Sequence, residues 1–255
     1  DEEGIDFTPR PGKRGGAFCS NQHSIKQSRV LTNFTGSFGN VITLAHELGH
    51  AYHGDQIFKE RVLNSSYTMP VAETASTFCE TIVKNAALKE ADKDEKIFIL
   101  EQSLKGSTQV IVDILSRFIF ESNVFDKRQS TPLNVRMLNE LMLDSQEQAY
   151  GDSLDPDFMQ PYAWLNKPHY YIGGLSFYNF PYAFGLLFAK GIYAEFIKQG
   201  APFVDKVNLL LQKTGQMTVE NVAGLVGIDL SSESFWDSSL EVIVKEIDLF
   251  LELTK

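Results

Sequence analysis

Hydrophobic positions recur at three- and four-residue spacing along most of the chain, a pattern typical of amphipathic helices. The pattern runs from residue 92 to residue 144 with one clear interruption at Ser130-Thr131-Pro132. Further helices are expected over 180–199, 201–214, 218–226 and 234–253. Gly200 is the expected C-cap of the first of these. Long helices separated by few turns indicate helices packed on helices, so the expected fold is mainly α.

Two short segments near the start have the residue types of β-strands. Residues 15–20 and 28–34 are rich in β-branched or aromatic residues and are bounded by Gly, Pro or Asn. We therefore expect a helical bundle with a small N-terminal β-strand pair or sheet. An extended peptide could add a strand to the open edge of such a pair, although an ordinary hairpin packed on helices fits the pattern equally well.

The segment from Thr43 to His53 contains the pattern H-E-x-x-H as His46, Glu47 and His50. On a helix, residues four apart lie on the same face, so both imidazoles can reach one metal ion. Glu47 lies at the edge of that face, where it can act on a water molecule. This arrangement is typical of a zinc hydrolase with two ligands and a general base. A surface helix with two solvated histidines is the alternative, and Asn40 is the expected N-cap.

Catalytic zinc usually has three protein ligands, so a third must come from elsewhere. His53 follows His46 by seven residues, or about 10.5 Å along a helix, which is too far to share the ion. We expect it to support the site or face substrate. Glu73 and Glu80, on the helix expected over 70–88, are better candidates. Spacing favours Glu73, and Glu80 would then bind the far nitrogen of a histidine. Their apolar neighbours argue against two solvated carboxylates.

Composition narrows the class of protein further. Hydrophobic residues make up 43% and charged residues 22% of 255 residues, which is ordinary for a soluble globular protein. A net charge of -10 without a basic tract argues against a nucleic-acid partner. No apolar run is long enough to span a membrane. Two cysteines, Cys19 and Cys79, do not make a disulfide framework, which favours a reduced, cytoplasmic protein. Because Asp1-Glu2-Glu3 resembles the interior of a chain, we expect upstream sequence to be missing.

Several further stretches match a known family. They are Pro11 to Cys19, Val30 to Gly36, His46 to His53, Pro70 to Glu80, His169 to Tyr171 and Phe177 to Gly185. Together they resemble oligoendopeptidase F, of the thimet-oligopeptidase group of zinc peptidases. The resemblance implies one zincin-like metallopeptidase catalytic domain over residues 1–255, zinc as cofactor, and Glu73 as third ligand. It implies short peptides as substrates and a missing N-terminal helical half as partner.

The expected reaction is hydrolysis of internal bonds in short oligopeptides, with Glu47 as general base. The resemblance also implies that an aromatic cluster faces the zinc. Its expected members are His169, Tyr171, Tyr178 and Tyr182. Their hydroxyl and imidazole groups can donate hydrogen bonds to a developing oxyanion, although packing in the core is the alternative for each tyrosine. The rival hypotheses are a catalytically incompetent zinc- and peptide-binding fragment, and a zinc hydrolase acting on other substrates.

Overall fold

The computed structural model describes residues 4–255, so the first three residues of the expected domain lie outside it. Contacts within the chain divide it into two compact units. The first unit contains the chain up to Glu101 together with Gly185–Lys255, and the second contains Gln102–Phe184. The boundaries fall inside helices α4 (Lys93–Thr108) and α7 (Phe180–Gln199). The described chain is mainly helical with one small sheet, which confirms the expected fold class.

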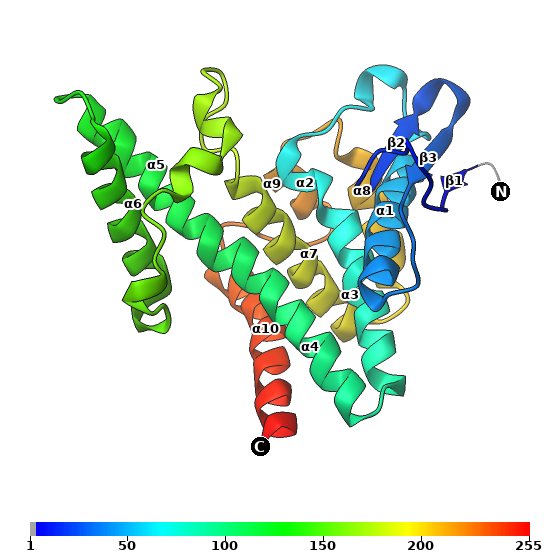
Figure 1. Cartoon of the computed structure of the whole chain (residues 1–255). Helices are drawn as coiled ribbons and strands as arrows, with labels where there is room; N and C mark the ends of the chain where they lie inside the picture. Colours follow the sequence, from blue (N-terminus) through cyan, green and yellow to red (C-terminus); the bar gives the residue numbers. More distant parts are fainter. Residues whose placement is uncertain (1–3) are drawn as a thin grey trace. The chain divides into compact units, whose positions relative to one another are not determined.

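A three-stranded sheet opens the first unit. The strands are β1 (Ile5–Asp6), β2 (Phe18–Gln22) and β3 (Gln27–Leu31), in the order β1-β3-β2. β2 and β3 are antiparallel and correspond to the two predicted strands, whereas β1 pairs with β3 in parallel. Strand β1 was not predicted, because two residues are too few to show the alternation of hydrophobic and polar positions that marks a strand. β2 therefore lies at an edge of the sheet (Figure 1).

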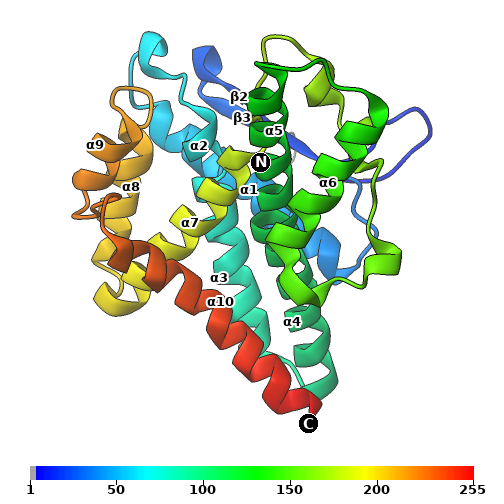
Figure 2. The same cartoon turned by 90° about the vertical axis from the view of Figure 1, so that its left-hand side faces the viewer.

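Helix α1 (Phe38–Ile57) is central to the first unit and packs against the sheet, α3 (Thr74–Glu90) and α8 (Phe203–Lys213). Both views show α1 and α3 side by side (Figures 1 and 2). The remaining helices of this unit are α2 (Met69–Ala72), α9 (Val219–Gly224) and α10 (Glu233–Thr254). The predicted C-terminal helices are thus present, and the Gly200 N–H donates to the Phe196 carbonyl 2.8 Å away, as expected of a C-cap.

The N-terminus of α1 differs from the prediction. Ser37, not Asn40, is the N-cap, and its hydroxyl accepts a hydrogen bond from the Asn40 N–H. Asn40 lies in the first turn, where its side-chain oxygen accepts from the Thr35 N–H at 2.8 Å. Both residues can cap a helix, and the extended backbone of Ser37 decides that the helix begins earlier.

The helix expected over residues 70–88 is broken at Glu73. α2 ends at Ala72 and α3 begins at Thr74, with Glu73 at φ -86° and ψ 0° between them. α1 approaches this junction closely because Gly49 has no side chain. A Cβ at Gly49 would lie 2.5 Å from the Ser76 Cα. The close approach brings the H-E-x-x-H helix against the start of α3.

The second unit consists of one long helical run followed by a return helix. A π-helical segment at Gln109–Asp113 links α4 to α5 (Ile114–Arg128), and α6 (Val135–Tyr150) packs against α5. The predicted interruption at Ser130-Thr131-Pro132 falls between α5 and α6. The loop predicted from residue 146 begins later, because α6 continues to Tyr150, and it contains several short 3-10 turns. The core of this unit is formed by Phe120, Met142 and Trp164.

Candidate functional site

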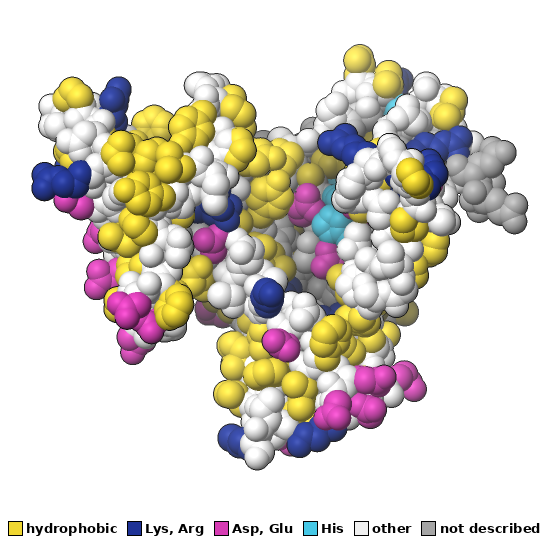
Figure 3. Space-filling model, in the orientation of Figure 1, with side chains coloured by type: hydrophobic (Ala, Val, Ile, Leu, Met, Phe, Trp, Pro, Cys, Tyr) yellow, Lys and Arg dark blue, Asp and Glu magenta, His cyan; other side chains and the backbone are white. Residues whose placement is uncertain are grey.

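Three side chains of the first unit converge on one point. The Nε2 atoms of His46 and His50 lie 3.1 Å apart. The Oε2 atom of Glu73 lies 3.3 Å from the first of these nitrogens and 3.6 Å from the second. Among the described residues these three form a group that could hold a metal ion. In Figure 3, histidine and acidic side chains gather on the surface over α1 and α3.

The hydrogen bonds of His46 and His50 outside the cluster indicate which ring nitrogens can offer a lone pair to a metal ion. The Nδ1 atom of His46 donates to the Glu80 carboxylate, and His50 has a hydrogen bond with the backbone of Ala72. With a proton on Nδ1, a neutral histidine presents the lone pair of Nε2 to the centre. Three such atoms can face one another only with a proton or a metal ion between them. The donor set therefore fits a divalent metal.

The distances also fit zinc. Ligand atoms at about 2.0–2.1 Å from a tetrahedral ion are separated by about 3.3–3.4 Å. The three separations of 3.1, 3.3 and 3.6 Å lie around this value. Two imidazole nitrogens and one carboxylate are ligands that suit zinc and leave a fourth position open.

Electrostatics at the centre favour positive charge. Burial alone lowers the pKa of His46, but hydrogen bonds with Glu73 and Glu80 outweigh it and raise this pKa to about 10. His50 behaves differently, because burial and the neighbouring His46 lower its pKa. The two carboxylates thus stabilise one positive charge at the position where the three acceptor atoms meet.

Glu73 is held in place by two neighbours. The Ser76 hydroxyl lies 3.0 Å from both the backbone carbonyl and the Oε2 atom of Glu73. On α7, Gly185 leaves room for it, since a Cβ there would lie 2.9 Å from the Glu73 Cβ. Its position at the break between two helices, rather than inside one, sets the direction of its side chain.

Glu47 has the environment expected of a general base. Glu47 is 6% exposed, and its Oε2 atom is buried without a hydrogen-bond partner in the described structure. Burial raises the pKa of this carboxyl, and Glu73 and Glu80 raise it further against the opposing effect of His46. A carboxylate with a raised pKa binds a proton more readily near neutral pH.

A cavity of about 620 Å³ opens beside these groups. His46, Glu47 and Glu80 form one wall. Residues before β2 and after β3, among them Gly16, Ala17 and Asn33, form another wall. The unpartnered carboxylate of Glu47 and the edge of the sheet therefore share one space. This size and shape suit a short extended peptide.

His53 does not have the expected position near substrate. It is completely buried, its ring is stacked on Tyr67, and its Nε2 atom lies 2.8 Å from the Thr214 hydroxyl. Burial, followed by the effect of His50, lowers its pKa to about 3, so the ring is neutral. Seven residues after His46, His53 lies on nearly the same face of α1 but about 10.5 Å further along, where α8 packs on the helix and covers it.

The second unit brings three of the four predicted aromatic residues together. The ring centroids of His169 and Tyr178 are 5.7 Å apart, and the hydroxyls of Tyr178 and Tyr182 are 3.1 Å apart. His169 is buried with an unpartnered Nε2 atom, and burial lowers its pKa. Tyr171 is 60% exposed and shares none of these contacts in the described structure. The catalytic role of all four residues stays a prediction.

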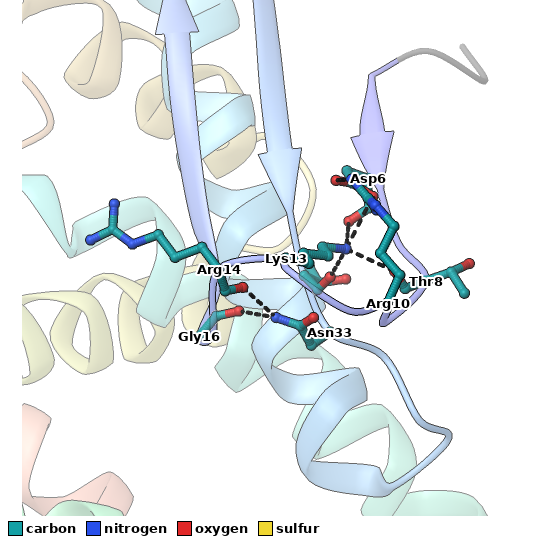
Figure 4. Close-up of polar contacts among 8 residues, drawn as sticks. Asp6, Thr8, Arg10, Lys13, Arg14, Gly16 and Asn33 are labelled. Carbon is teal, nitrogen blue, oxygen red and sulfur yellow. Dashed lines mark hydrogen bonds and ion pairs between the residues drawn. The ribbon is translucent and has the colours of Figure 1, made fainter.

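Sequence reasoning missed the residues that shape the sheet side of the cavity. Asn33 donates to the carbonyls of Arg14 and Gly16, both at 3.0 Å, and so fixes the chain that leads into β2 (Figure 4). Lys13 is covered almost completely and donates to four oxygens nearby. The stretch from Pro11 to Cys19 was recognised only as part of a resemblance. A single lysine between Gly12 and Arg14 carries no signal of burial.

Comparison with known proteins finds relatives among bacterial oligopeptidases. Oligopeptidase PepF of Bacillus subtilis (strain 168) is 26% identical over 253 residues, covering 98% of this chain and 37% of that protein. The chromosomal oligoendopeptidase F of Lactococcus lactis subsp. cremoris is 28% identical over 253 residues, with coverages of 97% and 41%. The chain therefore spans about two fifths of the length of these relatives.

Solved structures show the same fold. A protein from Chlamydophila abortus described as a peptidase matches with a TM-score of 0.87 and 25% identity, over 98% of this chain and 42% of that one. PZ peptidase A, solved with an inhibitor, matches with a TM-score of 0.71 and 19% identity, over 97% and 44%. The second likeness concerns the fold alone.

A family model decides the classification. The model of peptidase family M3 matches residues 3–242, which is most of the chain. This match includes the H-E-x-x-H helix, the Glu73 junction and the aromatic cluster. The resemblance to oligoendopeptidase F is confirmed by the relatives above. The chain belongs to peptidase family M3.

Proposed function

We propose that this chain is the zinc-binding catalytic portion of an endopeptidase that hydrolyses internal bonds of short oligopeptides. One observation carries the proposal: three acceptor atoms from His46, His50 and Glu73 meet at 3.1–3.6 Å beside the unpartnered carboxylate of Glu47. The names of the relatives, oligopeptidase and oligoendopeptidase, support peptides as the substrate class.

In the proposed site, His46, His50 and Glu73 hold the ion and Glu80 orients His46 through its Nδ1 atom. Zinc, when bound, supplies Lewis acidity and lowers the pKa of a water ligand to about 7. The Glu80 contact keeps the proton of His46 on Nδ1 and makes Nε2 a better donor of its lone pair. Removal of such a partner typically weakens metal binding about 10–100-fold.

Glu47 does the proton transfer in this proposal. Its carboxylate accepts the proton of the attacking water, and the new C–O bond forms at the peptide carbonyl carbon. Glu47 then donates this proton to the leaving amine as the C–N bond breaks. Its burial favours this role because a raised pKa lets the carboxyl both accept and release a proton near neutral pH.

The substrate is proposed to lie along the edge strand β2. Gly16 and Ala17, directly before β2, line the same cavity as His46 and Glu47. Backbone hydrogen bonds from an added strand give affinity without depending on side chains, which suits a peptidase of short peptides.

His169, Tyr171, Tyr178 and Tyr182 are proposed to stabilise the oxyanion. The hydroxyls of Tyr178 and Tyr182 lie 3.1 Å apart, and the buried Nε2 atom of His169 has no hydrogen-bond partner among the described residues, which supports this role. Replacing Tyr178 or Tyr182 with Phe tests this role, since loss of one donor costs about 10²–10³ in kcat. Tyr171→Phe is expected to have the smallest effect of the three.

No helix of the described chain is both long and apolar enough to cross a membrane. A cytoplasmic location is proposed from the two free cysteines. The remaining part of the longer relatives is proposed as the natural partner of this chain, because the relatives are about two and a half times as long.

A pool of short peptides tests the proposal directly. Mass spectrometry of the pool after incubation should show internal cuts that disappear with a chelator and return with zinc. The experiment needs the protein as it is naturally produced, including any part beyond this chain. Binding of zinc and peptides without cleavage would instead support the incompetent binding fragment. Peptide cleavage that resists chelation would overturn the metal site.

A further inference from the structure

The loop between β1 and β2 presents one arginine whose charge is not neutralised. Residues 7–17 form this loop, and Arg14 lies in it. The Arg14 side chain has no ion pair and donates no hydrogen bond among the described residues. Its guanidinium lies 6.0 Å from the ring centroid of Phe18, the first residue of β2. Figure 4 shows it pointing away from Asp6 and Lys13.

The base of the loop is rigid. Lys13, with a side chain 1% exposed, donates to the Asp6 carbonyl and carboxylate at 2.9 and 3.0 Å. It also donates to the carbonyls of Thr8 and Thr32 at 3.1 and 2.5 Å. Arg10 forms a bidentate ion pair with Asp6 at 2.6 and 2.8 Å. These contacts neutralise Asp6 with the other two cations of the loop, so Arg14 remains without an acidic partner (Figure 4).

The other end of the loop is fixed to the wall of the cavity. Asn33 holds the carbonyls of Arg14 and Gly16 together, and Gly16 has φ +79°, which a residue with a side chain rarely adopts. Gly16 and Asn33 both line the cavity that contains Glu47. Arg14 is two residues from Gly16, a backbone distance of at most about 7 Å. Its long side chain can reach a ligand in that space.

The charge of the cavity makes this position significant. Glu47 and Glu80 line it, and no Lys or Arg belongs to its lining in the described structure. The chain as a whole carries a net charge of -10. The positive charge favoured at His46, His50 and Glu73 lies at the metal-binding centre, on the α1 side of the cavity. Arg14 adds a second positive charge at the start of the edge strand, where it can attract a carboxylate of the ligand.

We propose that Arg14 is a specificity-determining residue that binds a carboxylate of the peptide substrate lying along β2. The carboxylate belongs either to an acidic side chain or to the peptide C-terminus. A guanidinium suits this group because its donors match the two carboxylate oxygens. Phe18 supports the guanidinium from one side without neutralising it. The inference rests on the proposed peptidase function of the same cavity.

Four fluorescent peptides of one sequence test the inference in the protein as it is naturally produced. They carry either Glu or Gln at one position and end in either a free carboxylate or an amide. Arg14→Gln should lower kcat/KM about tenfold or more for peptides with the recognised carboxylate and leave the uncharged peptide unchanged. Arg14→Lys should retain part of the preference. Arg61→Gln, at an exposed arginine outside the cavity lining, is the matched control for loss of one positive charge.

The pattern of loss identifies the source of the carboxylate. A decrease for both free-acid peptides indicates the C-terminus, whereas a decrease for both Glu peptides indicates the side chain. Equal effects on all four peptides, or none, would overturn the inference while leaving the peptidase intact. If the parent protein cleaves none of them, the proposed function fails. The role of Arg14 is then tested by fluorescence anisotropy, which measures binding of the same peptides to the parent protein and to Arg14→Gln. Equal affinity of the two proteins for the carboxylate peptides would overturn the inference.

Discussion

Two clusters in the first unit are centred on carboxylates, and their contacts are opposite in kind. Around Glu246, Lys84 and Lys190 donate to the same oxygen, at 2.5 and 3.2 Å, and all three residues are buried. Around Glu73, the Nε2 atoms of His46 and His50 face the carboxylate oxygen and each other, and an imidazole nitrogen can either donate or accept. Two permanent donors meet an acceptor in the first cluster, whereas in the second a metal ion can replace the proton on an imidazole.

This difference separates a structural ion pair from a functional site. Both clusters shift pKa values, since burial and the neighbouring Lys84 lower the pKa of Lys190 to about 8. A shifted pKa therefore does not distinguish them. The lysine cluster is complete without a ligand, while the His46, His50 and Glu73 cluster can exchange its proton for a metal ion. Only the second has an unpartnered buried carboxylate, Glu47, beside it.

The largest expected effect comes from Glu47→Gln. The variant should keep its zinc, because Glu47 is not one of the three converging residues, but lose about 10²–10⁴ in kcat. Peptide hydrolysis rates and metal content by mass spectrometry measure the two quantities on the same sample. Near-normal turnover in a metal-loaded variant would remove Glu47 from the mechanism.

The next largest effects are expected on zinc binding, which should depend on the Glu73 cluster and not on the Glu246 cluster. Glu73→Ala should abolish stoichiometric zinc, because only two ligands remain. Glu80→Ala should weaken zinc binding about 10–100-fold, because it removes only the partner of His46. Glu246→Ala is the matched control and should leave metal affinity unchanged. Competition with a zinc indicator ranks the three variants, and a reversed order for Glu73 and Glu80 would exchange their proposed roles.

The free energy of unfolding should fall more for Glu246→Ala than for Glu73→Ala, the opposite of their order in metal binding. Glu246→Ala leaves two buried lysines without their counter-charge, which costs about 3–5 kcal/mol of unfolding free energy. Metal-free Glu73→Ala leaves Glu80 paired with His46, so it should destabilise the protein less. Urea unfolding of both variants in the presence of a chelator tests this. A larger loss for Glu73→Ala would show that its carboxylate is mainly structural.

The smallest expected effect concerns the loop that carries Arg14. Hydrogen bonds from Arg10, then Lys13, hold the pKa of Asp6 well below its ordinary value of 3.8. A depressed folded-state pKa stabilises the protein above the ordinary value, and this contribution is lost as pH falls through the folded pKa. Asp6→Asn should therefore flatten the loss of stability below about pH 4. The exposed Asp237→Asn is its control, and identical acid unfolding curves for Asp6→Asn and the parent would contradict the assignment.

The sequence alone determined the parts of the protein that follow from local periodicity. These parts are the helices, the turn at Ser130-Thr131-Pro132 and the placement of His46 and His50 on one helix face. Each depends only on the spacing of residues along one element, which can be read from the sequence. Glu73 was one of two candidates by spacing, and the family resemblance selected it. β1, with two residues, and the π-helical segment at Gln109–Asp113 have no periodic signal.

Only the tertiary structure decided which side chains meet. The close approach of α1 and α3 at Gly49 and the break at Glu73 bring that carboxylate to the two histidines and Glu80 to the far nitrogen of His46. The packing of α8 on α1 likewise buried His53 in the core. Contacts between residues distant in sequence depend on how closely backbones can approach and which charges remain unpaired. Backbone approach and charge pairing of this kind arise only when the chain is folded, so no single segment of the sequence determines them.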